Sequence, residues 1–257
     1  MGYNLFSGLQ VYFIGLRTVK KYPELKKWMI IPFIIDLFLF FLLLYFTFNF
    51  LPAVTTYFVG WIEGAITSLF QAAALDWLFD ISYFIFLILF GIVSIIAAIY
   101  AAYILSLIIA SPFNSLLAEK TLQLTGALPE EPFKIGRWLS FTIKMFIVAL
   151  LKAVVFLIVG LFAFIIAFIP GLNILSIYIT LYMMSLDLFD YSLEAAGYNL
   201  TQRLGFGRKE VPMISGVSLA LFATTLIPGL FFVLAPLGVV GASRIHAEKM
   251  LLKGSSE

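Results

Sequence analysis

The heptapeptide Tyr-Pro-Glu-Leu-Lys-Lys-Trp near the N-terminus holds residues that are well suited to bind an anion. Pro23 suits the first turn of a helix, and Glu24 complements the positive end of the helix. Lys26 and Lys27 then place two cations beside backbone N–H groups that a helix start leaves without intrahelical partners. The pattern predicts an anion site at Glu24, Lys26 and Lys27. The alternative is anchoring at the cytoplasmic face, with Trp28 at the interface.

Three further cations, Arg137, Lys144 and Lys152, form a stripe along a predicted apolar helix. Because each residue turns a helix by about 100°, the first two share a face and the third drifts from it by about 80°. The stripe rises about 22 Å, at 1.5 Å per residue. Cations at such depth usually face a bundle interior or an aqueous cavity. An anion path is one interpretation, and snorkelling to the headgroups is the other.

A Ser-Pro-Phe-Asn run predicts a helix start that interrupts an apolar stretch, with Ser111 as the cap and Pro112 in the first turn. Asn114 and Glu119 follow, and we interpret them as candidates for a polar pathway or its gate. The alternative is a solvated helix beyond the membrane. A carboxylate on an anion path needs a cationic partner, and two residues are candidates: Lys120 and Arg203.

Three acids lie inside or beside apolar segments: Asp36, Asp187 and Asp190. An acid in a spanning helix is a functional candidate by default, although Asp36 also lies within reach of the lysines at 26–27. The other two acids are expected to form ion pairs with Arg203 or Lys209 rather than to bind a metal.

Two Pro-Gly pairs interrupt long apolar stretches, and each is predicted to form the tip of a hairpin: Ile169-Pro170-Gly171-Leu172 and Ile227-Pro228-Gly229-Leu230. Pro cannot donate to a helical ladder, and Gly commonly ends a helix. In hydrocarbon a broken helix is tolerated where it is buried in protein or lines a cavity, and such helices form ion sites in transporters. Asn173 is predicted to cap the returning helix. The alternative is two Pro kinks in ordinary spanning helices.

The composition is that of an integral membrane protein. Of 257 residues, 63% are apolar and 12% are charged, and the mean hydropathy is +1.08. There is no cysteine, which excludes thiol catalysis, disulfides and thiolate metal sites. His246, the only histidine, is expected at the surface without a chemical role. The first 18 residues lack the features of a cleaved signal peptide.

The positions of the cations predict the topology. All sixteen Lys and Arg residues fall in four clusters, at 17–27, 120–152, 203–209 and 244–253. Because cytoplasmic segments are enriched in Lys and Arg, we place all four clusters and both termini in the cytoplasm. The cation-free windows at 28–119, 153–202 and 210–243 must then each leave the cytoplasm and return.

These windows predict an all-α membrane protein with one domain over residues 1–257. Residues 1–29 form a cytoplasmic or interfacial segment, and 30–120 hold two spanning helices, at 30–51 and 81–110, joined by an acidic external segment. Residues 211–246 are too short for two spans, because the stretches 214–227 and 230–241 fall below the roughly 20 residues needed. They therefore predict a re-entrant hairpin, as does 140–200, for which full spans are the alternative.

No enzyme is expected from this sequence. It contains no phosphate-cradling Gly-rich loop, no serine nucleophile motif and no histidine placed as a base. We expect neither cofactor nor metal. A nucleic-acid partner is excluded because the basic residues are few and lie beside membrane segments.

The run Ser111–Lys120, with Leu124-Thr125-Gly126 after it, resembles the CysZ-type sulfate permeases, which share a domain family with eukaryotic etoposide-induced membrane proteins. Other segments support the resemblance along nearly the whole chain: Gly15-Leu16, Tyr22–Lys27, Ile31-Pro32, Ile169–Asn173, Asp190-Tyr191, Leu226–Leu230, Ala235-Pro236 and Gly241-Ala242-Ser243.

The resemblance implies a bacterial inner-membrane protein that admits sulfate for cysteine synthesis. It also implies two spanning helices, two partly inserted hairpins and a homo-oligomer in the lipid bilayer. The family usually has Gly-x-Arg-Arg where this chain has Glu24-Leu25-Lys26-Lys27, and that segment contributes a sulfate site. Lys lacks the planar fork that binds oxyanions bidentately. Asp36 stands where the family tends to have Asn, so a titratable group there would make transport pH-sensitive.

The leading hypothesis is therefore a permease, channel-like or gradient-driven, that conducts sulfate or a related divalent oxyanion into the cytoplasm. Two alternatives remain. One is a membrane-shaping or scaffold protein without a transported substrate, because partly inserted hairpins wedge one leaflet. The other is a permease for a different anion or a weak acid.

Overall fold

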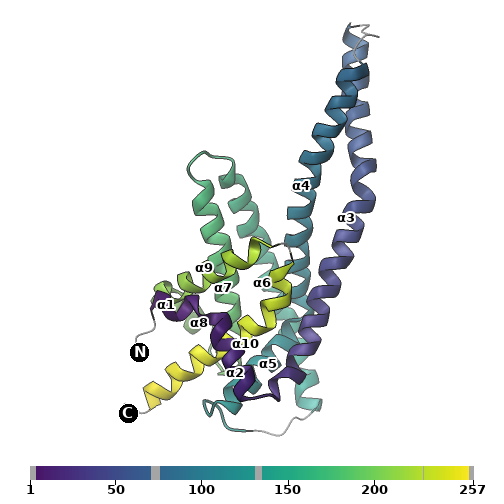
Figure 1. Ribbon diagram of the computed structural model, residues 1–257. Coiled ribbons are helices and arrows are strands. Elements are labelled where there is room, and N and C mark those ends of the chain that lie inside the picture. The colour runs from purple at the N-terminus through teal and green to yellow at the C-terminus, as the bar shows by residue number, and fades with distance from the viewer. Residues whose placement is uncertain (1–3, 71–75, 131–134, 228, 255–257) are drawn as a thin grey trace. The chain divides into compact units, whose positions relative to one another are not determined.

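The computed structural model describes residues 4–70, 76–130, 135–227 and 229–254, and within them the regular structure is helical throughout. The helices are α1 (Leu5–Leu9), α2 (Val11–Lys21), α3 (Leu25–Phe70), α4 (Asp76–Ile109), α5 (Ser111–Leu124), α6 (Ile135–Ala167), α7 (Asn173–Ala195), α8 (Leu200–Lys209), α9 (Val211–Thr225) and α10 (Leu230–Gly254), labelled in Figure 1. The side chains at 66–70, 76–80, 135–145 and 253–254 lie outside the described part. The predicted all-α class is confirmed.

Within the described residues, five helices contain segments long and apolar enough to cross a membrane: Leu25–Ala65, Ile81–Ile109, Phe146–Ala167, Asn173–Ala195 and Leu230–Leu252. α9 is apolar but shorter. The prediction that the second hairpin has two short arms is therefore confirmed for α9 and wrong for α10. α10 continues past Gly241 to Gly254 and has Pro236 in its interior. Both arms of the first hairpin are long enough to span.

Both Pro-Gly pairs break the helix rather than kink it. α6 ends at Ala167 and α7 begins at Asn173, with Gly171 at φ 86° between them. The second break lies between Thr225 and Leu230, with Gly229 at φ 85°, a conformation that glycine adopts without strain. Pro228 lies outside the described residues. The alternative of two Pro kinks is therefore wrong.

Residues 38–103 form one compact unit, made from the C-terminal part of α3 and most of α4. Phe58 on α3 packs edge-on against two rings of α4, with ring centroids 5.2 Å from Phe86 and 5.1 Å from Phe90. Many other apolar side chains of this pair are exposed, among them Phe41, Tyr57 and Ile88. A helix pair with an apolar exterior is suited to a lipid environment.

Residues 1–37 and 104–257 form the other compact unit, which has a densely packed interior. α10 packs against α2, α5, α7 and α9, and α7 also packs against α5 and α6. α5 is buried along most of its length, so the alternative of a solvated helix beyond the membrane is wrong. Ser111 is also not a cap: Ala110 holds that position, while Pro112 lies in the first turn as predicted.

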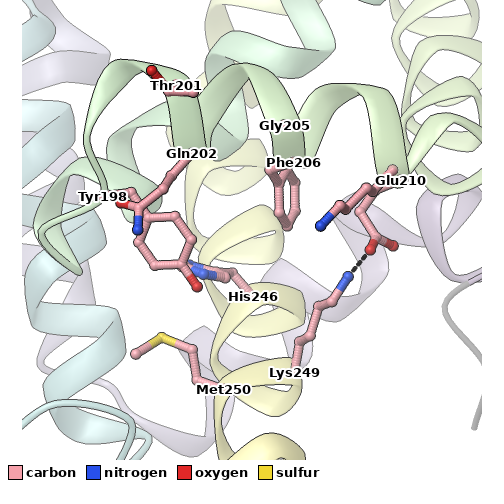
Figure 2. A pocket seen from close by; sticks show the side chains of 10 residues that line it. Tyr198, Thr201, Gln202, Gly205, Phe206, Glu210, His246, Lys249 and Met250 are labelled. Atoms are coloured by element: carbon pink, nitrogen blue, oxygen red, sulfur yellow. Dashed lines mark hydrogen bonds and ion pairs between the residues drawn. The ribbon is translucent and has the colours of Figure 1, made fainter.

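His246 is buried, with 1% of its surface exposed, so the expectation of a surface histidine is wrong. Its ring lies edge-on to Tyr198 and Phe206, with centroid distances of 5.5 and 5.8 Å (Figure 2). The reason is the length of α10, which carries the polar C-terminal segment back into the interior of this unit.

Glycines allow the backbones of two helix pairs in this unit to touch. A Cβ on Gly8 would collide with the carbonyl oxygen of Met213, and one on Gly216 with that of Leu5, so α1 and α9 touch through their backbones. α2 and α10 repeat the arrangement, because a Cβ on Gly241 would collide with the Val11 carbonyl oxygen. Small residues are what allow helix backbones to approach this closely.

We predict that Gly241→Ala lowers the free energy of unfolding by about 1–3 kcal/mol, because the added methyl group forces α2 and α10 apart. Gly60→Ala is the matched control: it also lies inside a helix, but a Cβ there has no neighbour within 4 Å. Denaturation of both purified variants in detergent measures the difference. Equal stability of the two variants would contradict the backbone contact.

Candidate functional site

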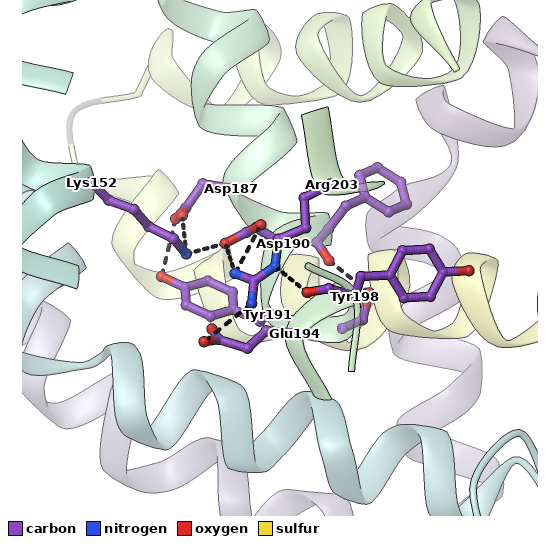
Figure 3. A network of polar contacts seen from close by, with 9 residues as sticks. Lys152, Asp187, Asp190, Tyr191, Glu194, Tyr198 and Arg203 are labelled. Carbon is purple, nitrogen blue, oxygen red and sulfur yellow. Dashed lines mark hydrogen bonds and ion pairs between the residues drawn. The ribbon is translucent and has the colours of Figure 1, made fainter. Parts of the chain in front are cut away.

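A buried set of charges is centred on one face of α7. Asp187, Asp190, Tyr191 and Glu194 follow one another at spacings of three, one and three residues, which places them on the same side of a helix. Lys152 reaches them from α6, and Arg203 reaches them from α8 (Figure 3). We refer to these six residues as the α7 network.

Lys152 is held by two carboxylates. Its Nζ forms an ion pair with Asp190 and lies 3.4 Å from Oδ1 of Asp187. The Tyr191 hydroxyl donates to Oδ2 of Asp187 over 3.0 Å, and the Lys152 ammonium lies 5.0 Å from the centroid of the Tyr191 ring. Every group on this side of the network thus has a defined partner.

Arg203 joins the other end of the network. Its NH1 lies 3.2 Å from Oδ2 of Asp190, and its NH2 lies 3.3 Å from Oε1 of Glu194. Nε donates to the backbone carbonyl of Tyr198 over 3.0 Å. The predicted ion pair between Asp190 and Arg203 is confirmed, whereas the partner of Asp187 is Lys152 and neither Arg203 nor Lys209.

The α7 network contains two cations and three carboxylates, all with less than a fifth of the side chain exposed. With every group ionised, its formal charge is −1. Lys152 and Arg203 are therefore neutralised by neighbouring acids, so they do not form a bare cationic lining for an anion. The remaining members of the predicted stripe, Arg137 and Lys144, have side chains outside the described part.

Further polar groups extend the buried region toward α3, α4 and α5. Asp36 is 1% exposed and accepts a hydrogen bond from the Ser106 hydroxyl. Asn114, on α5, is also buried. Asp36 therefore belongs to the interior, and the alternative that it pairs with the exposed lysines at 26–27 is wrong.

Glu119 reaches a cation through an intermediate residue. The amide of Gln123 donates to Glu119 Oε1 over 3.2 Å and accepts from Lys120 Nζ over 2.8 Å. The Lys120 ammonium also lies 5.9 Å from the centroid of the Trp28 ring, which places it beside the start of α3. Of the two predicted partners, Lys120 is thus linked to Glu119, whereas Arg203 belongs to the α7 network.

Among the side chains that the structure describes, a run of exposed cations lies where α2 meets α3. Five basic side chains are exposed there: Arg17, Lys20, Lys21, Lys26 and Lys27. Glu24 is the one acid within this segment and is also exposed. We refer to these six residues as the α2–α3 patch, and their formal charge is +4.

The backbone at this helix start does not provide the predicted donors. The N–H groups of Leu25, Lys26 and Lys27 donate to the carbonyls of Tyr22, Pro23 and Glu24 over 3.1–3.2 Å. The premise of unpaired N–H groups is therefore wrong for these three residues, and an anion would bind here through the lysine side chains.

The tip of the first hairpin exposes apolar residues. Pro170 and Gly171 are exposed beside Phe168, which is 74% exposed. Asn173 is the first residue of α7 and follows the cap position, which is Leu172, so the predicted cap is wrong. Its Oδ1 instead accepts from the backbone N–H of Ile174 over 2.9 Å.

Sequence reasoning missed Ser106, Gln123, Tyr191 and Glu194. The spacing of the polar residues from 187 to 194, inside a helix that is otherwise apolar, is the signal that would have found the last two. Ser106 and Gln123 have no such signal, because their roles depend on partners from other helices or on the rotamers of neighbours.

Comparison with known proteins shows which sequences this chain is similar to. The family model described as sulfate transporter CysZ/etoposide-induced protein 2.4 matches residues 11–236. A protein of Pseudomonas aeruginosa (strain LESB58) named sulfate transporter CysZ is 25% identical over 256 residues, which cover 96% of this chain and 98% of the relative. A protein of the same name from Pseudomonas fluorescens (strain Pf0-1) is 25% identical over 244 residues, covering 93% and 92%.

We predict that Lys152→Met lowers the free energy of unfolding by about 3–5 kcal/mol, because it leaves the Asp187 carboxylate buried without its cation. Adding Asp187→Asn should recover most of that loss, since the asparagine is neutral and still accepts from Tyr191. Lys20→Met, at an exposed position, is the control and should change stability by less than about 0.5 kcal/mol. A double variant no more stable than Lys152→Met would refute the pairing.

Proposed function

The chain belongs to the sulfate transporter CysZ/etoposide-induced protein 2.4 family, and on this premise we propose that it is a permease that carries sulfate into the bacterial cytoplasm. Supplying sulfur for cysteine biosynthesis is the corresponding physiological role. The observation that carries the proposal is the contrast between the exposed α2–α3 patch, with its charge of +4, and the neutralised interior. Sulfate would be recruited at the α2–α3 patch and would then have to pass the α7 network, whose charges are already paired.

The α2–α3 patch is suited to recruitment. Sulfate is a divalent anion, and a cluster of like charges raises the local concentration of an oppositely charged solute. Lys26 and Lys27 extend from the first turn of α3, and Lys120 lies near the same helix start through its contact with Trp28. Lys is a point charge rather than a bidentate fork, and Glu24 adds a negative charge, so binding would be weaker than with an Arg pair.

The α7 network and its neighbours are suited to act as a gate. Lys152 and Arg203 already have carboxylate partners, so a passing divalent anion must compete with Asp187, Asp190 and Glu194 for them. Asn114 and Glu119 would line the approach, and Arg137 and Lys144 would continue the pathway along α6. In this mechanism the ion pairs open as sulfate enters and re-form after it leaves.

We also propose the topology and assembly. Both termini lie in the cytoplasm, α3 and α4 span the membrane, and the hairpins of α6–α7 and α9–α10 are partly inserted, with tips at Pro170-Gly171 and Pro228-Gly229. One membrane domain of this kind would form homo-oligomers in the inner membrane. A cysteine introduced at Glu63 should react with an impermeant maleimide from outside intact cells. Labelling from the cytoplasmic side alone would reverse the orientation.

We predict saturable uptake of radiolabelled sulfate into liposomes that contain the purified protein. Lys26→Ala/Lys27→Ala should raise the half-saturating sulfate concentration about three- to tenfold, because two recruiting charges are lost. Arg208→Ala/Arg244→Ala removes the same charge elsewhere and serves as the control.

The effect of the lysine variant should shrink as ionic strength rises, because exposed charges are screened. Equal effects of both double variants would remove the α2–α3 patch from the mechanism. Folded protein without flux above empty vesicles, or flux of another anion alone, would favour the scaffold or a different permease.

We predict that Glu24→Gln lowers the half-saturating sulfate concentration about two- to threefold, because it removes the negative charge closest in sequence to the two lysines. Glu248→Gln, an exposed acid on α10, is the matched control and should leave transport unchanged. The same proteoliposome assay measures both variants. A higher half-saturating concentration in Glu24→Gln would mean that Glu24 orders the site.

A further inference from the structure

A cavity of about 540 Å³ lies between α8 and α10 (Figure 2). Ten residues line it: Tyr198, Thr201, Gln202, Gly205, Phe206, Lys209, Glu210, His246, Lys249 and Met250. This volume falls in the range of sites that bind small molecules. Its lining includes none of the charged residues of the α7 network and none of the α2–α3 patch, so the mechanism proposed for sulfate does not use it.

One side of the cavity is aromatic. The buried imidazole of His246 lies edge-on to Tyr198 at 78° and to Phe206 at 73°. Met250 adds a thioether, which packs favourably against ring edges. Figure 2 shows His246 and Met250 on α10 facing Tyr198. Planar rings of this kind favour a ligand with a flat apolar group, through edge-to-face or offset contact.

The other side of the cavity is charged. Lys249 forms an ion pair with Glu210 and lies 5.2 Å from the centroid of the Phe206 ring (Figure 2). Lys209 is exposed on the same rim. Two cations and one carboxylate leave a formal charge of +1, which favours an anionic group on the ligand.

We propose that this cavity binds a small organic anion that carries a planar ring. The ring lies against Tyr198, the partly exposed aromatic residue of the lining, and the anionic group lies at Lys209 and Lys249, where it competes with Glu210. Inorganic sulfate matches only the charged rim and leaves the aromatic side empty. The site is separate from the pathway proposed for sulfate, so direct binding tests it whether or not the protein transports.

Calorimetric titration of the full-length protein in detergent tests the proposal with three probes: adenosine 5′-monophosphate, benzoate and inorganic sulfate. Gly205→Leu is the blocking variant, because a Cβ at Gly205 has no neighbour within 4 Å and the added side chain projects into the cavity. We expect saturable binding of adenosine 5′-monophosphate and benzoate, weakened at least about tenfold by Gly205→Leu with an unchanged melting temperature. Failure of both organic probes to bind would overturn the proposal.

A surface substitution provides a second test that does not depend on core packing. Lys209→Gln should weaken binding of both organic probes about tenfold, because a charge-assisted contact is lost. Arg208→Gln is the matched control: it removes the same charge from the adjacent position, which lines a different groove, and should leave binding unchanged. Equal effects of the two variants would overturn the proposal. The proposal would also be overturned if sulfate bound as tightly as the organic anions and if Gly205→Leu abolished that sulfate binding.

Discussion

Neutralisation of charge inside the α7 network is the constraint on which the larger compact unit depends. A buried ion is strongly destabilising unless a partner of opposite charge and hydrogen bonds replace its water. Lys152 comes from α6, the carboxylates from α7 and Arg203 from α8, so three helices must meet in one register. The same requirement explains why the cations of the α2–α3 patch are exposed, since water solvates them there.

Features governed by the local chain were predictable. The apolar windows predicted the helices, and the Pro-Gly pairs predicted where α6 and α9 end, because neither residue needs a distant partner to interrupt a helix. The ion pair between Asp190 and Arg203 was also predicted, because the two residues lie close together in the sequence. The cations at 17–27 are exposed, because the cost of desolvation keeps unpaired charges out of the interior.

Features governed by tertiary packing were not predictable from the sequence. α10 continues beyond its apolar stretch because α2, α5 and α7 cover it, and this carries His246 inward, where composition alone suggested solvent. Asp187 finds Lys152, 35 residues away, rather than a nearer cation. The first three N–H groups of α3 donate to backbone carbonyls of the preceding turn, a geometry that residue types do not reveal. The contacts of several candidate residues therefore differ from those that the sequence predicted.

The glycine contacts join helices from opposite ends of the chain. Gly8 and Gly216 bring α1 against α9, and Gly241 brings α10 against α2, with backbone touching backbone. During synthesis on the ribosome, α1 and α2 emerge first, yet their partners are the last helices to be made. The N-terminal segment must therefore wait, exposed or shielded by another protein, until nearly the whole chain has been translated and inserted. Of the helices described, the two made first are therefore among the last to reach their final contacts.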